Sequence, residues 1–193
     1  MTPRPVDNPR SPWRRVTTFT LLIAAMLAVS AAGLGGEPEY RVKGVFLYRM
    51  AHFLQWPESN LPPKAKTIVI GVVGKDPFGK ELDLLEQLKP VDGRDVVTKR
   101  FKTAAEVKGV QILFLSSSLT DAEQAEIFGR ATKEGFVTVG EQKKFADRGG
   151  MFNLLIEDKK LAFEANSEAA KAAKIKVSSQ LLKLAKRVVT KDD

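Results

Sequence analysis

The sequence predicts an α/β fold: a single three-layer domain whose mixed, mostly parallel sheet is flanked by helices and followed by a C-terminal β-hairpin and a final helix. The first observation is a series of short apolar, β-branched runs, typical of buried strands, at 67–73, 110–115 and 136–139. The second is that segments of helical spacing separate these runs, which indicates parallel strands joined by helices. The third is a pair of strand-like runs near the C-terminus, 151–156 and 161–165, joined by Asp158-Lys159.

Apolar periodicity and capping residues predict the helices, and one further strand is expected at 95–101. The first helix, at 38–56, has apolar residues at helical spacing and is followed by a proline. Thr120 and Glu123 form a capping box that opens a later helix. Asn166 or Ser167 caps the helix after the hairpin. The remaining helices are expected at 80–88, 103–107, 120–132 and 177–189, the last of them amphipathic.

The N-terminal residues have the pattern of an export signal. Arg14-Arg15 precede an uncharged run, 16–36, that is apolar in its centre and rich in small residues beyond it. Cleavage after Ala32 leaves small side chains where signal peptidase requires them. The alternative is an uncleaved inner-membrane anchor, because the uncharged run has 21 residues. We expect a cleaved signal peptide at 1–32, export to the periplasm and a folded α/β domain at 38–190.

Composition excludes several kinds of site. The chain of 193 residues has no cysteine, so a disulfide, a thiolate metal site and a cysteine nucleophile are impossible. His52 is the single histidine, which argues against a histidine-rich metal site or a Ser-His-Asp triad. Of the net charge of +8, residues 1–32 supply +3, through their arginines, and the rest comes mainly from lysines spread along the chain, without the aromatic-interleaved basic patch of a nucleic-acid-binding protein. We expect no nucleic-acid partner and no cofactor; attraction to an anionic membrane surface is a second use of the charge.

The segment 74–81, GKDPFGKE, matches the phosphate-binding loop pattern except at its last position. Glu81 stands where a serine or threonine hydroxyl would bind Mg²⁺, and its charge would oppose the phosphates. We therefore expect no nucleotide hydrolysis and interpret the glycines and Pro77 as a strand-to-helix turn. Helix N-termini at strand ends can also hold small anions, so a small-ligand crevice is predicted from Gly74, Asp76, Phe78, Gly79 and Ser116. Structural capping is the alternative explanation of the serine.

Other polar and aromatic residues are expected to be structural. Tyr40, Tyr48, Trp56 and His52 are interpreted as core or rim residues of the first helix. The carboxylates at 76, 147, 157 and 158 lack the spacing of a known catalytic or metal-binding constellation, so we expect them at the surface. The pair Gly149-Gly150 is expected to serve a bulge or a tight start of the next strand.

Short strings of residues, weak individually but specific in their order and spacing, span 40–188. They lie at 40–48, 53, 56–57, 70–74, 76–79, 112–116, 137–140, 145–146, 149–151, 163–166 and 181–185. In this order they resemble the YfiR-like family of periplasmic regulators. Gly44 departs from the pattern, since alanine is usual there.

The resemblance implies an α/β domain that follows a signal peptide, forms homodimers and has no catalytic residues. It also implies a partner, the periplasmic part of an inner-membrane sensor protein, a diguanylate cyclase or a histidine kinase. Repression of a cyclase would lower cyclic di-GMP and disfavour biofilm. The family's best-known members use disulfides for redox sensing, which this cysteine-free chain cannot do. The alternative hypothesis is a periplasmic small-ligand or solute-binding protein, and an enzyme is not expected.

Overall fold

The computed structural model describes residues 37–158 and 160–190. Within them, the main sheet has seven strands in the order β3-β2-β4-β5-β6-β7-β9. The strands are β2 (Thr67–Val73), β3 (Asp95–Phe101), β4 (Ile112–Leu115), β5 (Val137–Gly140), β6 (Phe152–Glu157), β7 (Lys160–Asn166) and β9 (Arg187–Val189). Pairing is parallel from β3 through β6, antiparallel in the β6–β7 hairpin, and parallel again between β7 and β9. The predicted α/β class, mostly parallel sheet and C-terminal hairpin are confirmed.

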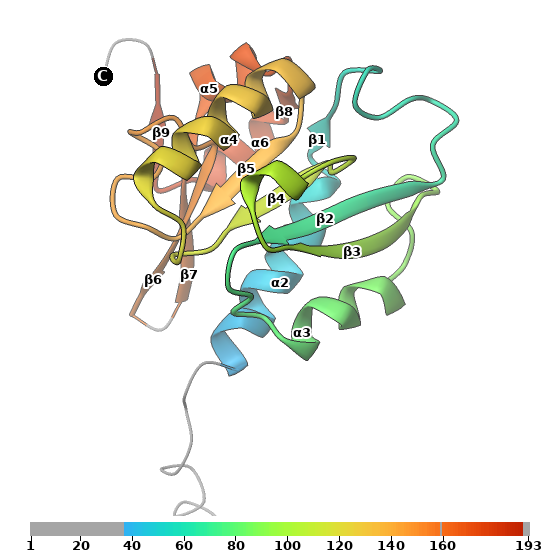
Figure 1. The fold of residues 1–193 in the computed structure, drawn as a ribbon, viewed down its shortest axis with the longest axis horizontal. Helices are drawn as coiled ribbons and strands as arrows, with labels where there is room; N and C mark the ends of the chain where they lie inside the picture. Colours follow the sequence, from blue (N-terminus) through green and yellow to red (C-terminus); the bar gives the residue numbers. More distant parts are fainter. Residues whose placement is uncertain (1–36, 159, 191–193) are drawn as a thin grey trace, which may run out of the picture. The chain divides into compact units, whose positions relative to one another are not determined.

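Helices cover both faces of this sheet, with α2 and α3 on one side and α4 and α5 on the other (Figure 1). The helical elements are α2 (Glu37–Ala51), α3 (Lys80–Asp83), the 3₁₀ turns η2 (Leu84–Gln87) and η3 (Ala104–Glu106), α4 (Asp121–Glu134), α5 (Ser167–Ala172) and α6 (Ser179–Leu184). A second, two-stranded sheet pairs β1 (Leu54–Gln55) with β8 (Lys176–Val177).

The central strands are apolar because both of their faces are covered. Every residue of β4 is buried, and in β2 only Thr67 is partly exposed. The capping box at Thr120 is present, and Gly135, with a φ of 74° that favours glycine, caps the C-terminal end of α4 after Glu134. Asn166 caps α5, accepting a hydrogen bond from the backbone N–H of Ala169, which decides between the two predicted caps.

The prediction of a final helix at 177–189 is wrong over much of that range. Only α6 is helical, and Arg187–Val189 forms the edge strand β9, paired with β7. Its valines are β-branched and extend the sheet, while the backbone N–H of Lys186 donates to the carbonyl of Phe163. A pattern that reads as an amphipathic helix is therefore divided between two elements.

The first helix is shorter than predicted, because α2 ends at Ala51 rather than near Trp56. The chain then turns into β1, and the Trp56 indole N–H donates to the Gln111 carbonyl at 2.9 Å. No helix among the described residues is long and apolar enough to cross a membrane. The predicted signal peptide at 1–32 lies outside the described residues.

Candidate functional site

Residues 74–80, called here the Gly74 loop, connect the carboxyl end of β2 to α3. Gly74 has a φ of 90°, and a Cβ there would approach the Ser118 hydroxyl to 2.6 Å. One oxygen of Asp76 accepts a hydrogen bond from the Phe78 N–H, and the other pairs with the Arg100 guanidinium, both at 2.7 Å. The carboxylate predicted to face a ligand is therefore engaged within the protein.

Two serines close the other side of this loop. The Ser116 hydroxyl donates to the Lys75 carbonyl at 2.7 Å, and the Lys75 N–H donates to the Ser118 hydroxyl at 2.9 Å. Phe78 is 3% exposed and packs edge-to-face between Tyr40 and Phe114, with ring centroids 5.3 and 4.8 Å away. The structure thus brings the predicted crevice residues together at the carboxyl ends of β2 and β4 and engages most of them in internal contacts. Ligand binding by this crevice stays a prediction.

Beside the Gly74 loop lies an open groove of about 490 Å³, called here the β6 groove. It is bounded by α2, by the loops that follow β4 and β5, and by the projecting part of β6. Its lining residues are Glu39, Tyr40, Lys43, Ser117, Glu141, Gln142, Lys143, Leu154, Leu155 and Ile156. None of the five predicted crevice residues is among them.

Lys43 anchors one wall of this groove. The residue is 3% exposed, yet its ammonium is compensated by ion pairs with both Glu39 and Glu141. It also lies 4.8 Å from the centroid of the Tyr40 ring, a cation–π contact. Because Glu141 directly follows β5, this cluster fixes the end of that strand to α2.

Tyr40 completes the cluster by donating a hydrogen bond to Glu141 at 3.0 Å. Burial of the phenol, followed by the charge and hydrogen bond of Glu141, raises the pKa of Tyr40 to about 12. The hydroxyl therefore remains a protonated donor at neutral pH. Interpreted from the sequence as core or rim, Tyr40 lies partly buried against the core and also lines the groove.

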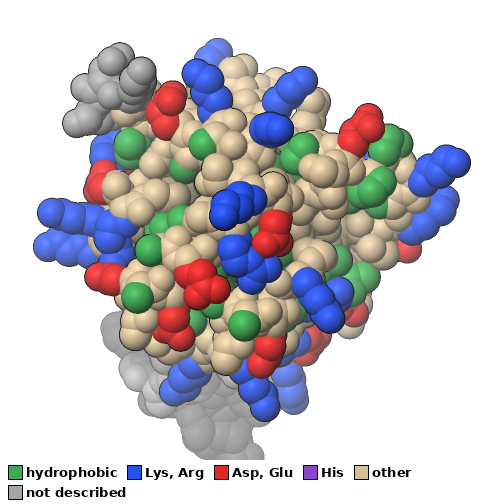
Figure 2. Space-filling view, turned by 45° about the horizontal axis from the view of Figure 1, so that its top comes forward, with side chains coloured by type: hydrophobic (Ala, Val, Ile, Leu, Met, Phe, Trp, Pro, Cys, Tyr) green, Lys and Arg blue, Asp and Glu red, His purple; other side chains and the backbone are tan. Residues whose placement is uncertain are grey.

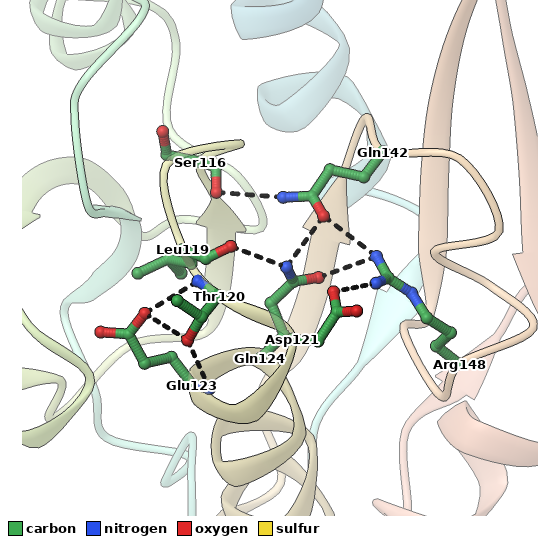
Figure 3. A network of polar contacts seen from close by, with 8 residues as sticks. All are labelled: Ser116, Leu119, Thr120, Asp121, Glu123, Gln124, Gln142 and Arg148. Carbon is green, nitrogen blue, oxygen red and sulfur yellow. Dashed lines mark hydrogen bonds and ion pairs between the residues drawn. The ribbon is translucent and has the colours of Figure 1, made fainter.

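A polar network fixes the groove-lining loop after β5 to the start of α4 (Figure 3). The Gln124 amide donates to Gln142 at 2.8 Å and to the Leu119 carbonyl at 3.1 Å. Arg148 donates to both glutamines, at 3.2 and 3.0 Å, and pairs with Asp121. Residues 141–143 are thus held from α2 on one side and from α4 on the other.

β6 projects beyond its neighbour β5 along the groove. Pairing between β5 and β6 ends at Gly140 and Asn153, whereas pairing between β6 and β7 continues to Glu157 and Lys160. The residues after Asn153 consequently have a strand partner on one side only. The opposite side of this segment borders the groove.

Sequence reasoning missed Lys43 and Glu141, although local patterns existed. Lys43 lies four residues before Leu47 and so shares the buried face of its helix, where a lysine requires a partner. Glu39, four residues earlier, is one such partner. Glu141 directly follows the buried parallel strand β5, the position at which α/β sheets place functional side chains.

The other predicted residues have structural surroundings. Asp147 pairs with Arg187 and Glu157 with Lys186 near the surface, and His52 is exposed. A Cβ on Gly150 would meet the Phe145 ring at 2.1 Å, so the backbone approaches that ring too closely for any side chain. Charges of both signs are interspersed on the face drawn in Figure 2. No cluster of three or more histidine or acidic side chains suited to a metal occurs in the described part of the chain.

Comparison with known proteins shows the family to which this chain belongs. No curated protein matches it. One solved structure, a conserved domain protein from Vibrio cholerae O1 biovar El Tor str. N16961, has a TM-score of 0.44 and 16% identity. The match covers 67% of this chain and 57% of that one. The model of the YfiR/HmsC-like family, DUF4154, matches residues 40–186, which include all the residues that line the β6 groove except Glu39. The chain belongs to the YfiR/HmsC-like family.

Proposed function

We propose that this protein is exported to the periplasm of a Gram-negative bacterium and regulates an inner-membrane signalling protein by binding its periplasmic part. A diguanylate cyclase is the proposed partner, with a histidine kinase as the alternative, and repression is the proposed effect. The observation that carries the proposal is family membership over residues 40–186. A homodimer is proposed as the active form, and no chemical step is required of the protein.

The groove supports a binding role. Its buried lysine is engaged by two carboxylates, and its tyrosine hydroxyl donates to one of them, so these groups form a rigid wall. A repressor acts only if it binds the inactive state of its partner more tightly than the active state. A preference of about 1.4 kcal/mol shifts that equilibrium tenfold.

The proposal is tested by deleting the gene and complementing the deletion with two forms of the protein. Deletion is expected to raise the partner's output, measured as cyclic di-GMP, and the full-length secreted form to lower it again. A form without residues 1–32 is expected to stay in the cytoplasm and to restore nothing. Full restoration by that leaderless form would contradict extracytoplasmic binding. Mass spectrometry of the periplasmic protein is expected to find its N-terminus near Gly33, whereas an intact chain in the inner membrane would favour the anchor.

A periplasmic small-ligand-binding protein is the second candidate function. The observation that favours it is the groove itself, which lies where α/β sheets commonly bind ligands. Genomic context separates the two candidates, because a neighbouring transporter permease supports solute binding and a neighbouring cyclase or kinase supports regulation.

A further inference from the structure

The projecting part of β6 offers unpaired backbone groups to the β6 groove. The Met151 carbonyl accepts a hydrogen bond from the Asn166 N–H at 2.7 Å. This bond shows which residues of β6 direct their backbone groups toward β7. In an antiparallel ladder, alternate residues direct their backbone groups toward the partner strand. The groups of Asn153, Leu155 and Glu157 are therefore directed toward β7, and those of Leu154 and Ile156 point away from it.

The outer edge of β3 shows how this fold closes another free edge. The Thr98 N–H, which points away from β2, donates to the Glu86 carboxylate at 2.7 Å, and its hydroxyl donates to the same oxygen. A side chain thus occupies a position that an added strand would need. No side chain or loop in the described part of the chain bonds to the backbone of Ile156 on its groove side.

The groove also has side-chain features that select its occupant. Leu154 and Ile156 share one face of β6; Leu154 is buried, whereas Ile156 is 42% exposed and offers an aliphatic contact. Lys143 lines the groove and forms no ion pair with any described residue, whereas the charge of Lys43 is neutralised by Glu39 and Glu141. An extended backbone with an aliphatic side chain and an acidic residue complements these features.

We propose that the edge of β6 binds an extended segment of a partner protein as an added strand. The backbone of Ile156 bonds to the segment, and Lys143 pairs with an acidic residue on it. The inference rests on the proposed function only for the identity of the partner, because strand addition depends on backbone groups that the groove presents. Few backbone groups are free, so the affinity is modest and the side chains supply selectivity.

Ile156→Pro is the sharpest test. It removes the N–H that faces the groove and leaves the β6–β7 ladder bonds, which is where a strand tolerates proline. The probe is a short capped peptide of alternating valine and threonine with one glutamate, titrated into the domain lacking residues 1–32 and followed by amide NMR. We expect shifts at Leu154 and Ile156 in the parent, and binding at least about tenfold weaker in Ile156→Pro. Ile156→Val, which keeps the N–H, is expected to lose less than about threefold.

Lys143→Glu provides a test that does not depend on how the proline variant folds. It is expected to weaken the glutamate peptide and to strengthen the same peptide with lysine in place of glutamate. Absence of binding to the parent, shifts confined to another surface, or equal binding by a folded Ile156→Pro would each overturn the proposal. Concentration-dependent protection of Ile156 without peptide would also overturn it, in favour of pairing between two copies. These failures are distinct from failure of the proposed function, which the deletion experiment measures separately.

Discussion

The Gly74 loop and the β6 groove both lie at the carboxyl ends of the parallel strands, but they differ in how their polar groups are used. In the loop, Asp76 and Ser116 bond to neighbouring chain segments, and Phe78 is part of the core. In the groove, Lys143 lacks an ionic partner among the described residues and the backbone of Ile156 lacks a second strand. The pattern typical of a phosphate-binding loop thus stabilises the fold, while the less conspicuous residues form the accessible surface.

Loss of the Phe78 ring is the largest effect expected from this comparison. Phe78→Ala removes a buried ring between two aromatic neighbours, and we expect the free energy of unfolding to fall by about 3–5 kcal/mol. Urea denaturation measures the change. Leu84→Ala, at a side chain that is 42% exposed, is the control and is expected to cost within about 0.5 kcal/mol. An equally small cost at Phe78 would contradict its assignment to the core.

Removal of the Lys43 ammonium is expected to have the next largest effect. Lys43→Met leaves Glu141 without its cation. Because water partly reaches the carboxylates of Glu39 and Glu141, the expected loss in the free energy of unfolding is about 2 kcal/mol, less than for a fully buried pair. The double variant Lys43→Met with Glu141→Gln is expected to recover part of that loss, because no charge is then left uncompensated. A double-mutant cycle by chemical denaturation measures the coupling. Additive losses would show that the two residues do not act as a pair.

Gly74→Ala tests how tightly the loop is closed. The new Cβ meets Ser118 at a φ of 90°, and we expect a loss of about 2 kcal/mol, measured by thermal unfolding. Gly93 also has positive φ, at 76°, but open space around it, so Gly93→Ala isolates the backbone contribution at about 1 kcal/mol. Equal effects at the two glycines would argue against close packing of the Gly74 loop.

The smallest expected effect is on the pH dependence of stability, through Glu164 in the β6–β7 hairpin. Burial raises the pKa of Glu164, but the hydrogen bonds donated by Arg187 and Asn153 outweigh it, and the pKa lies below its ordinary value of 4.5. A lowered folded-state pKa adds stability above the unfolded pKa, and that contribution is lost as pH falls through the folded pKa. Glu164→Gln is therefore expected to lose less stability on acidification below pH 4.5 than the parent does, by under about 1 kcal/mol. Parallel stability–pH curves would contradict this assignment.

Local patterns predicted the elements whose cause is local. The buried strands β2 and β4, the α4 capping box and the hairpin follow from runs of apolar residues and from turn chemistry. Strand β9 could not be predicted this way, because its conformation depends on the free edge of β7 rather than on its own spacing. The same applies to the groove, where Lys43 and Glu141 are 98 positions apart and meet only through the sheet topology.

Charge reversal at one exposed lysine from each region, in the secreted protein, tests whether the β6 groove or the Gly74 loop is the functional surface. Lys143→Glu alters the groove, and Lys80→Glu makes the same change in the Gly74 loop. Each form is returned to a strain that lacks the gene, secretion is confirmed, and cyclic di-GMP is measured. We predict that Lys80→Glu restores repression as the parent does and that Lys143→Glu does not. Restoration by Lys143→Glu together with failure of Lys80→Glu would instead place the functional surface at the Gly74 loop.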